Sequence, residues 1–132
     1  MKNKENTYSF LKSNGFKLIE QDTSEYFGDY YDTFANDAFE LRFSSSKSFE
    51  TVDIRSIGEK GNWYDLSLVK ALLHNEEKLN NVTTIEEHND FLKKELDRIS
   101  DLFSKRNYPT TKRKLEELGN KRAKQMFPRM IN

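Results

Sequence analysis

Two neighbouring segments of the chain alternate charged and apolar residues in a way that could support metal chemistry. One segment reads Phe39-Glu40-Leu41-Arg42-Phe43, and the other reads Val52-Asp53-Ile54-Arg55. A carboxylate on one strand and an acid-x-base unit on the next can hold a divalent metal beside a charge-stabilising cation. Asp37 or Glu40, taken with Asp53 and Arg55, has this outline. A metal-dependent nuclease is therefore one hypothesis for the chain.

The same charged residues have a structural interpretation. Side chains two residues apart on a strand share a face, and opposite charges on neighbouring strands pair across it. Arg55 stays protonated and cannot act as a base. The order of the expected helices and strands also resembles the core of the restriction-endonuclease-like superfamily. In that superfamily the basic residue of the acid-x-base unit is usually Lys, where this chain has Arg55.

Other catalytic signatures do not occur in the sequence. There is no phosphate-binding glycine loop, nucleophile elbow or zinc-protease motif. The two histidines, His74 and His88, lack the spacing of a metal-binding motif. We therefore predict a protein that is not an enzyme and that uses no metal and no cofactor.

The net charge of zero conceals a strong segregation of charge. Residues 105–132 contain nine basic and two acidic side chains, which gives them a charge of +7 and leaves −7 on the rest. Residues 20–40 contain seven acids, six aromatic residues and no Lys or Arg. Such a distribution sets up local potentials that favour charged partners.

The acidic, aromatic stretch is the strongest candidate for a binding surface. Tyr26, Phe27, Tyr30 and Tyr31 occupy both faces of any strand drawn through them, so one set must point away from the main core. Surface aromatic residues beside carboxylates suit the anchoring of a basic partner. The predicted partner-binding residues are Tyr26, Asp29, Tyr30, Tyr31, Asp32, Glu40, Arg42, Asp53 and Arg55.

These residues need a scaffold, which the periodicity of the sequence outlines. A helix over residues 7–13 should end at Asn14-Gly15. Strands are expected over residues 16–20, 26–35, 39–43 and 49–57, with a loop at residues 44–48. Three or four short antiparallel strands follow, with one apolar and one solvated face.

Helices dominate the second half of the sequence. Asp65 is a candidate N-cap, and Thr84 with Glu87 forms a capping-box motif. Tyr108-Pro109 should break the chain before a last helix that begins at Thr110 or Thr111. The fold class predicted is α+β: a small antiparallel sheet of three to four strands with helices packed on one face, an N-terminal helix and a C-terminal helical region.

The basic C-terminal segment allows two interpretations. Residues 1–104 are predicted to form the α+β domain, and residues 105–132 a basic helical extension packed on it through Leu115, Leu118 and Met126. Alternatively, the extension binds nucleic acid, with Tyr108 and Phe127 available for stacking. The excess of acids elsewhere would repel phosphates, so nucleic acid is the less favoured partner.

A resemblance adds to this interpretation. The residues Phe39-Glu40-Leu41-Arg42-Phe43, Val52-Asp53-Ile54-Arg55, Trp63-Tyr64-Asp65-Leu66, Val69 and Leu72 resemble a pattern found in small bacterial immunity-type proteins, which neutralise polymorphic or contact-delivered toxins. The pattern usually carries an Asp-Arg pair in the hairpin loop, where this chain has Ser44-Ser45-Ser46-Lys47. The resemblance implies a cytoplasmic binding module that occludes a cognate toxin.

Composition agrees with a cytoplasmic location. The chain has no Cys, which excludes a disulfide framework, a thiol nucleophile and Cys-ligated zinc. Its first residues are polar, and no apolar run reaches the length of a signal or membrane segment. We expect a cytoplasmic protein with no membrane partner.

Overall fold

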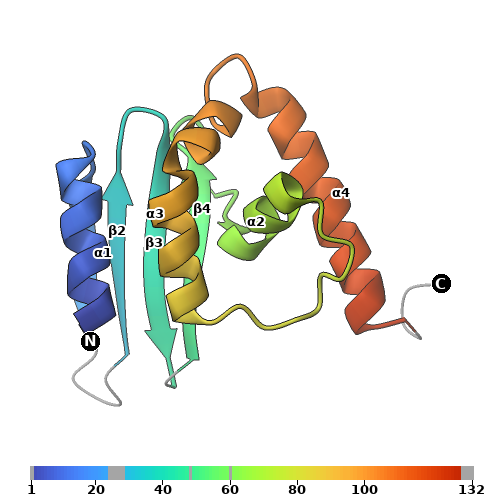
Figure 1. Cartoon of the computed structure of the whole chain (residues 1–132), viewed down its shortest axis with the longest axis horizontal. Helices are drawn as coiled ribbons and strands as arrows, with labels where there is room; N and C mark the ends of the chain where they lie inside the picture. Colours follow the sequence, from blue (N-terminus) through green and yellow to red (C-terminus); the bar gives the residue numbers. More distant parts are fainter. Residues whose placement is uncertain (1, 24–28, 48, 60, 129–132) are drawn as a thin grey trace.

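The computed structural model describes residues 2–23, 29–47, 49–59 and 61–128, and it is an α+β fold (Figure 1). Five strands form one antiparallel sheet in the order β1-β2-β3-β4-β5. The elements are α1 (Lys2–Ser13), β1 (Lys17–Thr23), β2 (Tyr30–Ala35), β3 (Phe39–Ser46), β4 (Phe49–Ser56), β5 (Tyr64–Asp65), α2 (Leu66–His74), α3 (Ile85–Leu102) and α4 (Tyr108–Met126). The predicted fold class is confirmed, but the predicted count of three to four strands is wrong.

The additional strand is β5. Its two residues pair with β4, Asp65 opposite Asp53 and Tyr64 opposite Ile54. Two residues are too short to show an alternating pattern, so periodicity could not reveal this strand. Its partners on β4 lie ten and twelve residues earlier in the chain, and only folding brings the two segments together.

The central strands follow the predicted alternation. Leu41, Phe43 and Ile54 are buried under the helices, and the charged residues between them point to the other face. The strand β3 also includes Ser44, Ser45 and Ser46, which the sequence placed in a loop. Lys47, at φ 52°, then begins the turn into β4.

Helix ends follow local signals where capping chemistry is present. The Asp65 carboxylate accepts a hydrogen bond from the Ser67 N–H, and Thr84 and Glu87 form the predicted capping box. The expected break at Pro109 is wrong, because α4 already begins at Tyr108. Proline is tolerated in the first turn, where its missing N–H would have no helical partner.

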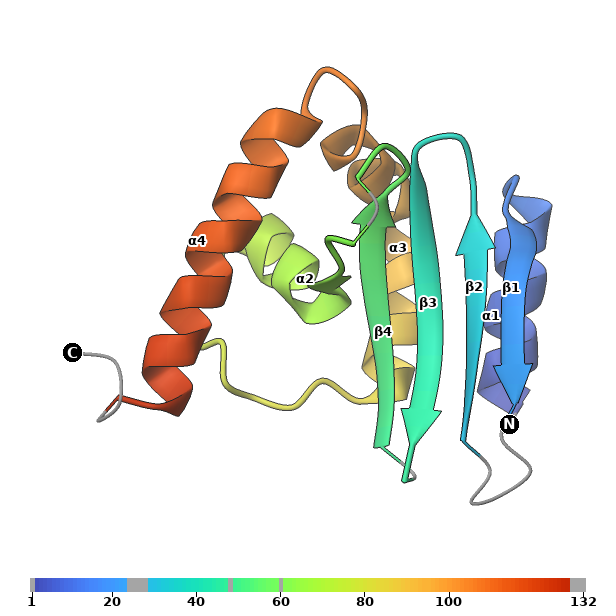
Figure 2. The ribbon, with the colours of Figure 1, turned by 180° about the vertical axis from the view of Figure 1, so that it is seen from behind.

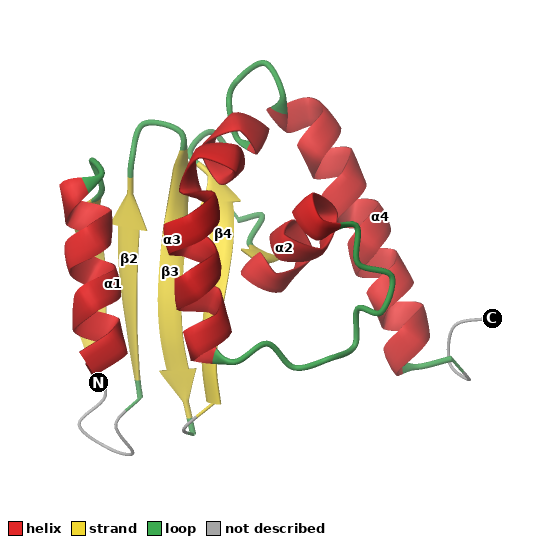
Figure 3. Ribbon diagram, viewed as in Figure 1, coloured by secondary structure: helices red, strands yellow, loops and turns green. Residues whose placement is uncertain are grey.

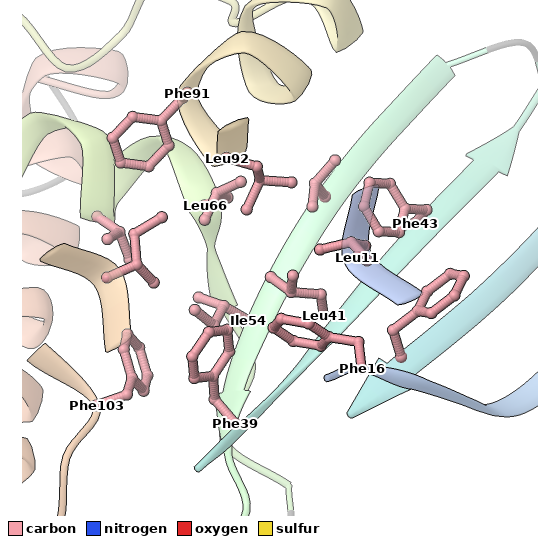
Figure 4. Packing of buried hydrophobic residues seen from close by; sticks show 14 of the residues in the cluster. Leu11, Phe16, Phe39, Leu41, Phe43, Ile54, Leu66, Phe91, Leu92 and Phe103 are labelled. Carbon is pink, nitrogen blue, oxygen red and sulfur yellow. The ribbon is translucent and has the colours of Figure 1, made fainter. Parts of the chain in front are cut away.

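One apolar core joins the sheet to the helices (Figure 4). Leu11 of α1, Leu92 of α3 and Leu66 of α2 are fully buried against the inner face of the sheet. Leu115 of α4, also fully buried, belongs to the same cluster. The ion pairs Lys112–Glu59 and Arg122–Asp65 further connect α4 to the chain before α2.

The helices leave one face of the sheet uncovered. In Figures 1 and 3, α1 and α3 lie in front of the strands, and Figure 2 shows the strands in front when the molecule is turned around. The helices α2 and α4 lie beyond the β4 side of the sheet. Within the described residues, no helix has both the length and the apolar character needed to cross a membrane.

Candidate binding surface on the open sheet face

Strand alternation places five of the predicted site residues on the open face of the sheet. Because Leu41 and Ile54 point into the core, their neighbours Glu40, Arg42, Asp53 and Arg55 point outward. Tyr31 on β2 lies opposite Ser44, which shares this face. The antiparallel register then puts Glu40 opposite Arg55 and Arg42 opposite Asp53.

An arginine–aromatic cluster, made of Tyr31, Arg42, Arg55 and Trp63, forms the centre of this face. The guanidinium carbon of Arg42 lies 4.4 Å from the centre of the Tyr31 ring and 4.7 Å from that of Trp63. The guanidinium carbon of Arg55 lies 4.2 Å from the centre of the Trp63 ring. These are cation–π distances, so the two cations and two rings hold one another in place.

Each of the two arginines is bound by a carboxylate: Arg55 by Glu40 and Arg42 by Glu20. Arg55 donates from Nε and Nη2 to the two carboxylate oxygens of Glu40 at 2.9 and 3.1 Å. Glu40 is only 1% exposed, so it acts as a buried anchor for Arg55. Arg42 donates to Thr33 Oγ1 at 2.9 Å and to Glu20 at 2.6 Å. Two-point binding of each guanidinium restricts its orientation.

The cross-strand pairing expected of the charged residues is observed for one pair. Arg55 and Glu40 form an ion pair between opposite residues. Arg42 lies opposite Asp53 but makes its ion pair with Glu20 on β1. Burial and then the nearby Asp65 carboxylate raise the pKa of Asp53 to about 6.

The other predicted site residues lie elsewhere. Tyr30 points to the α1 side of the sheet, where Lys4 Nζ is 3.8 Å from the centre of its ring. Asp32 is also on that side, only 2% exposed, and accepts a hydrogen bond from Tyr8 at 2.6 Å. The expectation that Asp32 is a surface carboxylate is therefore wrong, because the tyrosine and Lys4 at 3.4 Å hold it under α1.

A further predicted residue, Asp29, comes directly before β2. Asp29 accepts a hydrogen bond from the Lys47 N–H at 2.8 Å, which ties the β2 end to the β3–β4 turn. Tyr26 lies outside the described residues.

The histidines and acids that the structure describes do not gather into a metal-binding group. Among the residues that the structure describes, no three His, Cys, Asp or Glu side chains could jointly hold a metal ion. His74 lies at the end of α2 near Glu76 and Glu95, and His88 is buried in α3. Of the hypothetical nuclease residues, Glu40 is already occupied by Arg55.

Sequence reasoning missed two residues of this surface, Trp63 and Glu20. Trp63 is the single tryptophan of the chain and comes shortly before the predicted helix cap Asp65. These features mark it as unusual, but they do not predict that it lies on the open face. Glu20 was counted among the acids of the stretch, and its partner Arg42 is 22 residues away. Both placements depend on strand register.

No family model, curated protein or solved structure matches this chain. The geometry of the open face therefore carries the functional argument.

Proposed function

We propose that this chain is a non-enzymatic, protein-binding module of the immunity type, which occludes a cognate toxin in the bacterial cytoplasm. The observation that supports it is the arginine–aromatic cluster on the open sheet face. Trp, Tyr and Arg are the residue types that most often dominate the energy of protein interfaces. Here Tyr31, Arg42 and Arg55 lie on strands, and Trp63 of the loop before β5 is held by both arginines, so little ordering is needed on binding.

The charges around the cluster suit a basic partner. Glu20 and Asp22 of β1 lie on the open face, opposite Thr33 and Tyr31 in the strand register. All seven residues of β1 are exposed. Rim carboxylates raise the rate of encounter with a basic surface, whereas a desolvated aromatic centre slows dissociation. A toxin that acts on nucleic acid would present such a basic surface.

The predicted binding residues therefore take different parts in the proposal. Tyr31, Arg42, Asp53 and Arg55 contact the partner, together with Trp63. Glu40 positions Arg55 from beneath. Asp29 and Tyr30 lie toward one end of β2, and Asp32 supports the sheet from the α1 side.

The test uses the product of the reading frame immediately upstream of this one. Its expression should arrest growth, and co-expression of this chain should restore it. Trp63→Ala and Arg42→Ala should each weaken the purified complex by about 2 kcal/mol or more, as expected for central interface residues. Calorimetry or surface plasmon resonance measures the change.

The matched control is Arg113→Ala. Arg113 and Arg42 each pair with a glutamate, at 3.0 and 2.6 Å, but Arg113 lies on α4 away from the sheet face. It should bind the partner like the wild type. Full protection by the Trp63→Ala variant, or equal loss in the Arg113→Ala variant, would contradict the proposal.

A second candidate, nucleic-acid binding, is favoured by one feature of α4. The side chains of Lys114, Lys121 and Lys124 are exposed along this helix. If they bind phosphates, neutralising them should weaken binding of a fluorescent duplex and reduce the salt dependence of that binding. If the wild type shows no salt-dependent binding, this candidate is rejected and the proposal above is unaffected.

A further inference from the structure

The edge of strand β4 that faces away from β3 is only partly paired. The β5 strand pairs with Asp53 and Ile54 and then turns directly into α2, whose first turn is capped by Asp65. On the side away from β3, residues 49–52 have no strand partner and no other backbone hydrogen bond among the described residues. Unpaired backbone along a strand edge is a template for another extended chain.

A pocket of about 270 Å³ lies along this free edge. Its lining residues come from β4, β5, α2, α3, α4 and the α2–α3 connection, which is yellow in Figure 1. Thr51 of β4, Ser67 of α2 and Asn81 of the connection line it. Their neutral side chains can hydrogen-bond to the amides of a peptide, and the charged residues Glu50, Asp65 and Arg122 also line the pocket.

Apolar side chains rim the same pocket. Phe49 is 61% exposed, Val82 is 74% exposed and Met126 is 51% exposed, and all three line it. Large apolar side chains that are exposed together indicate a surface that is covered in some state of the molecule. They come from β4, from the α2–α3 connection and from α4, so the tertiary fold alone assembles them.

One residue that lines the pocket has a buried polar atom with no partner among the described residues. His88 lines the pocket and is 3% exposed, and its Nδ1 atom has no hydrogen bond among the described residues. Burial lowers the pKa of His88 and keeps the imidazole neutral, so it can donate or accept. Buried polar groups of this kind are ordinarily satisfied, so this unpaired nitrogen is an exception.

We propose that this groove binds an extended peptide segment, which adds to the sheet along residues 49–52 of β4 and inserts an apolar side chain between Phe49, Val82 and Met126. Main-chain pairing gives such a complex its affinity, and the pocket selects the side chain. The inference goes beyond the proposed function and does not depend on it, because the arginine–aromatic cluster takes no part in it.

The test starts from a displayed library of random linear peptides about six to eight residues long, the length of an ordinary strand. The full chain is the bait, and a selected peptide is then made synthetically. Val82→Asp and Met126→Asp should each weaken its binding by about tenfold or more, as replacement of an anchor does. Ile19→Asp is the matched control, since Ile19 is 53% exposed on β1 at the other edge of the sheet.

Hydrogen exchange shows whether the peptide binds as a strand. Binding should slow exchange of at least one backbone amide within residues 49–52, because a free donor there becomes paired. Three outcomes would overturn the inference. They are protection confined to β1, binding that leaves residues 49–52 unprotected, and a library that yields no peptide sensitive to Val82→Asp. The variants change exposed side chains, and their thermal unfolding verifies that each is folded.

Discussion

The guanidinium carbon of Arg55 lies 4.2 Å from the centre of the Trp63 ring, while its nitrogens bind both carboxylate oxygens of Glu40. Arg55 is thus held between a buried carboxylate and an aromatic ring. Arg42 approaches the same ring at 4.7 Å. This arrangement connects a strand pair to the loop that precedes β5, and it can be probed in the free protein.

Trp63 is the single tryptophan, so its fluorescence reports on the cluster directly. We expect Arg42→Ala and Arg55→Ala each to shift its emission to longer wavelength and to raise quenching by acrylamide. The reason is that the arginine side chains cover parts of the ring surface that water would otherwise reach. Arg113→Ala should leave the spectrum unchanged, and an unchanged spectrum in all three variants would mean that the ring is not held as described.

The two arginine–glutamate pairs of the open face should differ in energy. Glu40 is 1% exposed, so Glu40→Ala leaves Arg55 without its buried partner and should lower the free energy of unfolding by about 3 kcal/mol or more. The Glu20 side chain is 49% exposed, so Glu20→Ala should cost under about 1 kcal/mol. Urea unfolding measures both. Equal costs would contradict the burial that separates the two pairs.

The stability of the protein should depend on the protonation of Asp53. Burial and the neighbouring Asp65 raise its pKa to about 6 in the folded state, above the usual value for the unfolded chain. The folded state therefore binds the proton more tightly than the unfolded chain does. The contribution of Asp53 to the free energy of unfolding falls as the pH rises from about 4 through about 6. Above pH 6 the charged Asp53 carboxylate lowers the free energy of unfolding.

Asp53→Asn should remove that cost. After allowance for partial exposure, the variant should be more stable than the wild type by about 1 kcal/mol at pH 7, with the difference vanishing near pH 4. Urea unfolding across this range measures it. The comparison cancels contributions from other groups, including His88. A stability difference that grows toward low pH would contradict this prediction.

The C-terminal helix should be part of the cooperative unit. Leu115 is fully buried in the common core, so Leu115→Ala should lower the free energy of unfolding by about 2 to 5 kcal/mol. Met126 is 51% exposed, and Met126→Ala should change it by less than about 0.5 kcal/mol. Calorimetry should show one transition. If Leu115→Ala melts α4 alone while the sheet stays folded, residues 105–132 form a separate unit.

Local chemistry determined much of the secondary structure from the sequence alone. The alternation Phe39-Glu40-Leu41-Arg42-Phe43 predicts β3, and the caps at Asp65 and Thr84 predict the starts of α2 and α3. These signals act over two to four residues, so neighbouring side chains carry them completely. Pro109 is a local signal with two meanings, because proline can break a helix or lie in its first turn. The sequence predicted a break, whereas α4 begins at Tyr108.

The tertiary structure alone decided which residues form the surface. Glu20 reaches Arg42 across 22 residues of chain, and Asp32 is buried because Tyr8 lies above it in space. Trp63 joins the cluster because the two-residue strand β5 holds its loop beside β4. Each of these contacts depends on strand register and on which helix covers which face. Those are properties of the whole packed chain, and no short window of sequence contains them.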